Sequence, residues 1–225
     1  MNEKVTVAHR FGARSVAMID LPDTGEGDWD RFRTRMSECG IEHYQTFEAD
    51  IATFEPAEET ETFDVVHCSG VLYHHPSPLT VLERLVTITR RHLILTSAVI
   101  PSEIENDAGR LEVPSSGVIF VPAMSAAERS VLATSRNFGD AIAYGLTHPC
   151  SFRLHDFGPW WWLPTSTVLA AMCEVAGCEV VETAPLGSGF LTLLLRRRPD
   201  VGAGVGCMSE AVTRFALEPG RSVQP

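Results

Sequence analysis

The stretch that decides the fold is Phe63–Pro78, FDVVHCSGVLYHHPSP, in which an apolar run stops at a glycine and a crowded loop follows. The run Phe63–Cys68 predicts a buried strand that breaks at Ser69-Gly70. Pro78 then opens an amphipathic pattern that predicts a helix to about residue 89, and His92–Ile100 predicts a second buried strand. A strand, a helix and a strand in this order indicate parallel pairing in an α/β fold.

The same alternation of strands and helices precedes this stretch. Val5–Arg10 has the pattern of a helix end, and Ser15–Ile19 predicts a short strand that ends at Asp20. Trp29–Cys39 predicts a helix closed by Gly40, because glycine favours the left-handed conformation that ends helices. His43–Glu48 predicts a further strand. We therefore predict a Rossmann-like α/β fold with a doubly wound, mostly parallel sheet.

The pattern breaks down over residues 101–164, which we interpret as a cap or substrate-facing insertion, because so long a connection is unusual in a compact domain. It contains one predicted helix, Ser125–Arg136, with the Ser125 and Glu128 pair of a capping box. The alternation of helices and strands then resumes. The sequence predicts a helix capped by Thr165 or Ser166, a strand over Glu179–Thr183 and a last strand over Phe190–Arg196. We predict one domain over residues 1–198 and a flexible tail over residues 199–225, rich in glycine, serine and proline.

Composition limits the classes of function. The chain has 225 residues, 18 Lys and Arg against 29 Asp and Glu, and a formal net charge of −11, which argues against a surface that neutralises phosphates. Six cysteines lack any CxxC pair, Met1–Arg10 lacks the apolar core of a signal peptide, and no apolar run is long enough to span a membrane. We expect a cytoplasmic protein with reduced thiols, and the sequence gives no indication of oligomeric state.

Two acidic residues follow predicted strands and mark a ligand-binding edge. Asp20, followed by Leu21, can accept both hydroxyls of a ribose, and Asp50, followed by Ile51, can contact an adenine amino group against an apolar wall. The carboxyl ends of neighbouring parallel strands meet at one edge, so we expect both acids there. Each is, taken alone, also what an ordinary turn would contain.

The loop after Phe63–Cys68 offers further polar and aromatic groups. His74 or His75 can act as a general base, because the histidine pKa lies near working pH, although structural hydrogen bonding is the default interpretation. We predict no metal site, since two adjacent histidines rarely converge on one ion. Trp160, Trp161 and Trp162 form either an aromatic wall around a ligand or an anchor for the insertion.

The stretch Phe63–Pro78 resembles the fourth-strand motif of class I S-adenosylmethionine-dependent methyltransferases. It is most similar to the wobble-uridine tRNA carboxymethyltransferases and their relatives, which share GVLYH, a short loop and SPL, here Ser77-Pro78-Leu79. Those proteins also have a later aromatic-x-Pro-Ser/Thr segment that opens a helix, here Trp162-Leu163-Pro164-Thr165. The resemblance runs from about Val5 to Arg198.

The resemblance implies that S-adenosylmethionine, or its carboxylated relative, binds over the strand ends. By position, Asp20 and Leu21 would hold the ribose and Asp50 and Ile51 the adenine. The sulfonium would face Ser69, Gly70 and Val71, whereas Tyr73 and His74 would lie near the acceptor as catalytic residues, and His75, Trp161 and Trp162 would contact the substrate.

One expected motif is missing. Proteins of this family open with a strand and a glycine-rich loop, but nothing before Asp20 supplies it, so we expect that segment upstream of Met1. A permuted loop at Asp200–Gly206, DVGAGVG, is disfavoured because Arg196-Arg197-Arg198-Pro199 precedes it instead of an apolar strand.

Three functional hypotheses follow. The first is methyl transfer to a small-molecule or lipid-like acceptor, which the acidic balance and the insertion favour over tRNA, the runner-up substrate. The second is a non-catalytic methyltransferase-like subunit or fragment. The third, a dinucleotide oxidoreductase, leaves the stretch Gly70–Pro78 without a role.

Overall fold

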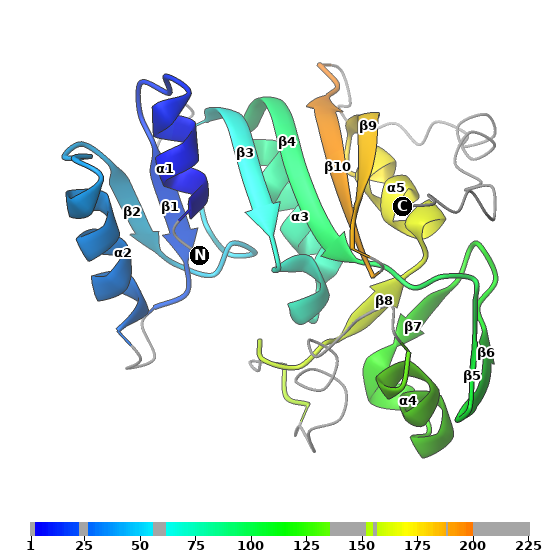
Figure 1. Ribbon diagram of the computed structural model, residues 1–225. Coiled ribbons are helices and arrows are strands. Elements are labelled where there is room, and N and C mark those ends of the chain that lie inside the picture. The colour runs from blue at the N-terminus through cyan, green and yellow to red at the C-terminus, as the bar shows by residue number, and fades with distance from the viewer. Residues whose placement is uncertain are drawn as a thin grey trace, which may run out of the picture. The chain divides into compact units, whose positions relative to one another are not determined.

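The structure is a computed structural model that describes residues 3–22, 27–55, 62–135, 152–154, 157–187 and 189–199. The chain divides into two compact units, residues 1–61 and residues 62–225, which are coloured blue and cyan to orange in Figure 1. Each unit has its own strands and helices. The predicted domain boundaries, 1–198 with a tail from 199, stay a prediction, and residues 200–225 lie outside the described part of the chain.

The first unit combines two helices with a two-stranded parallel sheet. Helix α1 (Glu3–Arg10) precedes strand β1 (Ala17–Asp20), and helix α2 (Asp28–Glu38) precedes strand β2 (Gln45–Glu48). The two strands pair in parallel from Ala17 opposite Gln45 to Asp20 opposite Glu48. One core cluster of the unit has six buried side chains, from both helices and from the segments before the two strands: Val5, Val16, Trp29, Phe32, Met36 and Ile41.

The second unit contains a four-stranded sheet in the order β3-β4-β10-β9. Its strands are β3 (Phe63–Ser69), β4 (Thr89–Ala98), β9 (Cys178–Leu186) and β10 (Phe190–Arg197). Strands β3 and β4 are parallel, whereas β10 is antiparallel to both of its neighbours. The sheet is therefore mixed, because the short turn after β9 returns the chain directly beside it.

Helices α3 (Pro78–Ile88) and α5 (Ser166–Val175) pack on one face of this sheet and contact each other (Figure 1). The strand residues beneath them alternate in burial, and Leu93, Leu95, Leu193 and Leu195 are all fully buried. They pair across the sheet, Leu93 opposite Leu195 and Leu95 opposite Leu193. Burying each such side chain contributes about 2 kcal/mol, so this row forms the main apolar core of the sheet.

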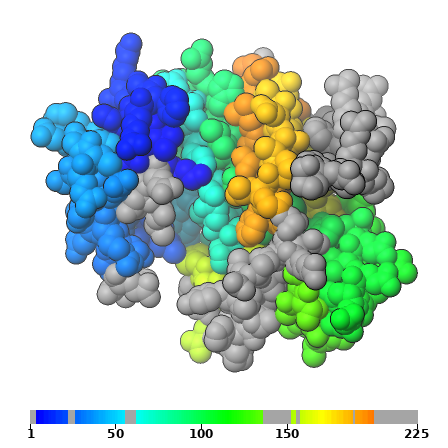
Figure 2. Space-filling model, viewed as in Figure 1, coloured from blue at the N-terminus to red at the C-terminus, as the bar shows by residue number. Residues whose placement is uncertain are grey.

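The described residues between 101 and 164, called the cap below, have their own secondary structure, whereas their role as an insertion stays a prediction. Strands β5 (Glu103–Asn106) and β6 (Gly109–Glu112) form a hairpin, and β7 (Val118–Phe120) pairs with β8 (Trp162–Pro164). Helix α4 (Ala126–Ala133) contacts both strands of the hairpin and carries the predicted capping box of Ser125 and Glu128. In Figure 2 the part of the cap up to α4 is the green region, a rounded body built from residues adjacent in sequence.

The element boundaries correct the sequence prediction in several places. Strand β1 begins at Ala17 rather than Ser15, and β4 begins at Thr89 rather than His92. Thr89 is β-branched and pairs with Phe63, so helix α3 passes into β4 without a loop. The cap is richer in strands than expected, because β7 and β8 find each other only across more than forty residues.

Three cysteines confirm the expectation of buried thiols. Cys68, Cys173 and Cys178 are buried and free, and Cys39 is half-buried and free. Burial raises the pKa of the Cys68 thiol to about 12 and that of Cys178 to about 11. No helix of the described residues has the length and apolar character needed to cross a membrane.

Candidate functional site

The two predicted acidic residues lie at the same edge of the sheet in the first unit. Asp20 is the last residue of β1, and Asp50 follows the end of β2 by two residues. The strands are parallel and in register at this end, where the Ala49 N–H donates to the Asp20 carbonyl over 2.8 Å. The structure therefore brings Asp20 and Asp50 to one strand-end edge, as the sequence predicts.

The Asp20 side chain is half-buried, and one of its oxygens accepts a hydrogen bond from a described residue. Its Oδ1 accepts a hydrogen bond of 2.9 Å from the Leu21 N–H, and the described residues supply no other hydrogen bond to the carboxylate. Burial raises the pKa of Asp20, whereas the Leu21 N–H lowers it. The second oxygen remains able to accept hydrogen bonds from a ligand such as a diol.

Asp50 instead organises its own turn. Its Oδ1 accepts from the Ala52 N–H over 2.9 Å, and its carbonyl accepts from the Thr53 N–H over 3.0 Å. This is the local pattern by which aspartate stabilises turns. The turn places the half-buried Ile51 directly after the acid, as an apolar wall for a planar ligand requires.

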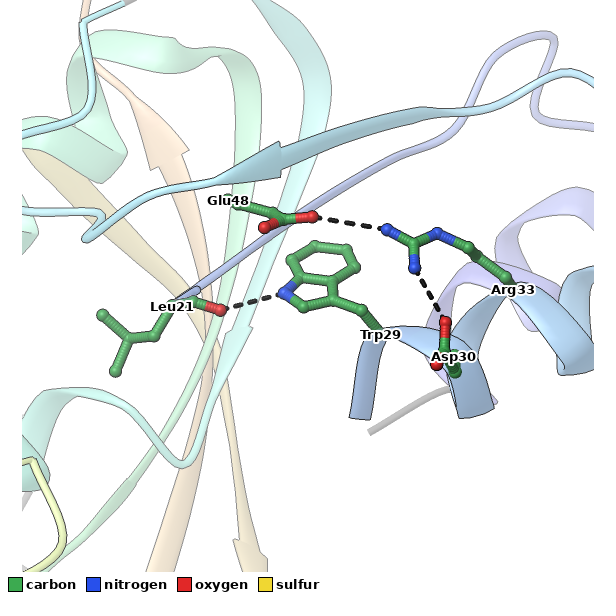
Figure 3. Close-up of polar contacts among 5 residues, drawn as sticks. All are labelled: Leu21, Trp29, Asp30, Arg33 and Glu48. Carbon is green, nitrogen blue, oxygen red and sulfur yellow. Dashed lines mark hydrogen bonds and ion pairs between the residues drawn. The ribbon is translucent and has the colours of Figure 1, made fainter. Parts of the chain in front are cut away.

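Two residues of α2 contribute to this edge and carried no signal in the sequence. The Trp29 Nε1–H donates to the Leu21 carbonyl over 2.9 Å, and Arg33 bridges Asp30 at 3.0 Å and Glu48 at 3.3 Å (Figure 3). Trp29 is 4% exposed, whereas the ion pairs of Arg33 are exposed and contribute little stability. A helical pattern marks Trp29 as a core residue but cannot show where its N–H points.

In the second unit, the end of β3 forms the tight turn that the sequence predicts. Ser69 ends the strand, and Gly70 follows with a φ of 79°, the left-handed region that favours glycine. The Gly70 N–H donates to the Thr96 carbonyl of β4 over 3.3 Å. Val71 is 36% exposed and begins the short 3-10 helix Leu72–His74. Ser69, Gly70 and Val71 thus lie together at the carboxyl end of β3.

Tyr73 presents its hydroxyl at this turn. The side chain is 8% exposed, and its ring packs edge-on against Trp160 and Phe190, with centroid distances of 4.9 and 5.9 Å. A Cβ added at Gly70 would lie 3.7 Å from the Tyr73 hydroxyl oxygen, so the hydroxyl stands over the glycine. No described residue bonds this hydroxyl, and it is not among the fully buried polar atoms.

His74 is held in one orientation by the cap. Its Nδ1 lies 3.2 Å from the Pro159 carbonyl oxygen, which can only accept, so Nδ1 carries the proton and donates. Burial lowers the pKa of His74, whereas the carbonyls of Pro159 and Gly158 oppose this. The neutral ring then has its lone pair on Nε2, the atom a general base needs.

The remaining predicted substrate residues link the β3 loop to the cap. The His75 ring stacks on the Phe157 ring, with the centroids 5.2 Å apart. The backbone N–H of Trp161 donates to the Tyr73 carbonyl over 2.7 Å. The Trp162 Nε1–H donates to the Pro76 carbonyl over 3.0 Å. Trp160 and Trp161 are 3% and 4% exposed, whereas Trp162 is half-buried. These contacts support the anchoring interpretation, and ligand contact stays a prediction for Trp162 above all.

Two further sequence hypotheses have separate outcomes. The permuted loop at Asp200–Gly206 falls outside the described residues. Among the residues that are described, no three His, Cys, Asp or Glu side chains are grouped to hold a metal ion.

No protein-family model matches the sequence, and no curated protein matches it. Among solved structures the chain is similar to magnesium protoporphyrin IX methyltransferase from Synechocystis PCC 6803 with bound S-adenosylhomocysteine. That likeness has a TM-score of 0.51 and 13% identity, and it covers 86% of this chain and 68% of the other. A proposed methyltransferase from Bacillus halodurans C-125 is similar with a TM-score of 0.52 and 14% identity, over 87% of each chain. The predicted fold is confirmed: the chain has the Rossmann-like α/β fold of class I methyltransferases.

Proposed function

We propose that the chain is an S-adenosylmethionine-dependent methyltransferase that acts on a small-molecule or lipid-like acceptor. One observation carries the proposal: a half-buried Asp20 carboxylate ends β1 and has an oxygen available to a ligand. An acid at this point of a Rossmann-like sheet is suited to bind a ribose diol. The fold shared with the two methyltransferase structures supports the same assignment.

In the first unit we assign the adenosine part of the cofactor. Asp20 would accept hydrogen bonds from the ribose hydroxyls, with Leu21 beside it, and Asp50 and Ile51 would contact the adenine. In the second unit we assign Ser69, Gly70 and Val71 to the cofactor as well, because Gly70 has no side chain to obstruct a ligand above the strand end.

His74 and Tyr73 are the proposed catalytic residues. Methyl transfer from a sulfonium makes a bond from the acceptor oxygen or nitrogen to the methyl carbon, breaks the carbon–sulfur bond and releases the acceptor's proton. Nε2 of the neutral His74 would take that proton, and the Tyr73 hydroxyl would orient the acceptor by a hydrogen bond. His75, Trp161 and Trp162 complete the proposed acceptor surface.

The net charge of −11 supports a small acceptor over a polyanion. The sequence resemblance makes tRNA wobble uridine the competing acceptor, with methyl or carboxymethyl as the transferred group. The two differ in the acceptor but share the cofactor site.

Calorimetric titration with S-adenosylhomocysteine tests the cofactor site. We expect micromolar binding, about −8 kcal/mol, and at least a tenfold loss in Asp20→Ala. Glu42→Gln is the matched control, because Glu42 is an exposed acid of the same unit, away from the strand-end edge. A folded chain that does not bind S-adenosylhomocysteine would contradict the proposal.

Transfer of a radiolabelled methyl group tests the acceptor. We expect label in small phenols, hydroxyl compounds or amines and none in total tRNA, with His74→Ala at least tenfold slower than the wild type and unchanged in S-adenosylhomocysteine affinity. Label in tRNA alone would transfer the assignment to the competing acceptor.

A non-catalytic subunit is the second candidate, and one observation favours it. Strand β3 lies at the edge of its sheet, so among the described residues no strand pairs with its outer side. Such an edge invites pairing with another chain. Concentration-dependent oligomers in light scattering, together with no S-adenosylhomocysteine binding, would support this candidate over the enzyme.

A further inference from the structure

The turn after β1 is fixed by a side chain from the next helix. Trp29 is the second residue of α2, 4% exposed, and its ring contacts Phe32 edge-on at 5.9 Å within the core of the first unit. Packing in a close-packed core leaves a large aromatic ring little freedom. The direction of the indole N–H is therefore set by the core itself.

That N–H reaches the backbone beside the proposed ribose-binding acid. It donates to the Leu21 carbonyl over 2.9 Å (Figure 3). The backbone N–H of Leu21 in turn donates to Asp20 Oδ1 over 2.9 Å. Both backbone polar groups of Leu21 are thereby held, one by Trp29 and one by Asp20. The carboxylate can rotate only if the Leu21 N–H bond is lost.

The backbone near Leu21 does not itself hold the Leu21 carbonyl in the β-ladder. The Leu21 carbonyl belongs to the peptide bond before Pro22, which has no N–H with which to continue a ladder. The Asp20 carbonyl is held separately, by the Ala49 N–H. The backbone ladder therefore ends at Asp20, and Leu21 depends on side-chain groups.

We propose that Trp29 is a positioning residue: its indole N–H fixes the Leu21 carbonyl and with it the backbone of Leu21, whose N–H orients the Asp20 carboxylate for the cofactor ribose. The inference rests on the proposed function for its ligand, but the positioning itself is a property of the free protein. The two are separable by experiment.

The first measurement is made without ligand. Trp29→Phe keeps an aromatic ring and removes the donor, and replacing Trp29 by β-(3-benzothienyl)alanine keeps the bicyclic shape as well. We expect amide hydrogen exchange at Leu21 to quicken at least tenfold relative to the Ala49 amide in both variants. Phe32→Leu, a core change that leaves the indole N–H in place, should not alter that ratio. An unchanged Leu21 ratio in both Trp29 variants would overturn the inference.

The second measurement is a double-mutant cycle on S-adenosylhomocysteine affinity. Trp29→Phe should weaken binding five- to tenfold in the wild-type background and less than twofold in Asp20→Ala, because Trp29 acts through Asp20. Equal losses in the two backgrounds would refute the positioning role even if the cofactor binds. Absence of binding by the folded wild type would instead refute the proposed function, while the exchange ratio still decides the positioning.

Discussion

Two loops follow parallel strands in this molecule, and each is tied by one tryptophan indole to a backbone carbonyl. After β1, Trp29 bonds Leu21 over 2.9 Å, eight residues away, whereas after β3, Trp162 bonds Pro76 over 3.0 Å, 86 residues away. The first tie is complete within one helix and one strand, whereas the second joins the β3 loop to β8, a strand that pairs with β7 of the cap. The difference separates a strand-end loop that is fixed locally from one that is fixed by the cap.

Truncating the two tryptophans should give the largest contrast. Trp29→Ala is expected to cost about 3–5 kcal/mol, because a buried ring is lost from a core of six side chains. Trp162→Ala should cost less than half as much, since Trp162 is half-buried. Hydrogen exchange should show lost protection across residues 3–55 in the first variant and in residues 72–76 in the second. If urea denaturation gave the same loss of unfolding free energy for both variants, the distinction between local and distant anchoring would be contradicted.

A backbone change at the β3 loop sharpens the comparison at intermediate size. Gly70→Ala is expected to cost about 1–2 kcal/mol, because an L side chain is strained at a φ of 79°. Gly158→Ala is the control, at a glycine of the cap beside His74. A Cβ at Gly158 meets no atom within 4 Å, so this substitution should change the free energy of unfolding by less than about 0.5 kcal/mol. The free energies of unfolding come from urea titrations. A Gly70→Ala variant as stable as its control would show that the turn accepts an L side chain without strain.

The smallest effect concerns pH, and it involves only the β3 loop. Burial holds the pKa of His74 below its ordinary value near 6.5, so the folded state favours the neutral ring. Stability from this group is fully present above the unfolded pKa of about 6.5 and is lost as pH falls from there through the lower folded pKa. We expect His74→Asn, which keeps a donor toward Pro159, to reduce the loss of stability between pH 7.5 and pH 5, by less than about 1 kcal/mol. The same pH dependence in wild type and variant would contradict this.

The sequence predicts best those features that depend on neighbouring residues. The α2 end at Gly40, the break of β3 at Gly70 and the capping box of Ser125 and Glu128 are all confirmed, because each is set by the conformational preferences of a few adjacent residues. The position of Asp20 at the end of β1 is confirmed for the same reason, because the acid directly follows an apolar run, whereas its role in binding stays a prediction.

Features that depend on distant residues could not be predicted. The pairing of β7 with β8, the bond from His74 to the Pro159 carbonyl and the direction of the Trp29 indole are decided by tertiary packing. The pair His74-His75 suggests a general base whether or not its rings are held by hydrogen bonds. The sequence does not tell which carbonyl a ring nitrogen will contact.

The buried cysteines have a practical consequence for studying the two units. Burial raises the pKa of the Cys68 and Cys178 thiols well above the ordinary cysteine value, so at pH 7 both are held in the protonated form. Maleimides and oxidants react with the thiolate, so both sites are slow to modify while the protein stays folded. Among the described cysteines, Cys39 at the end of α2 is the one accessible to such reagents. A fluorophore attached there would report on the first unit alone.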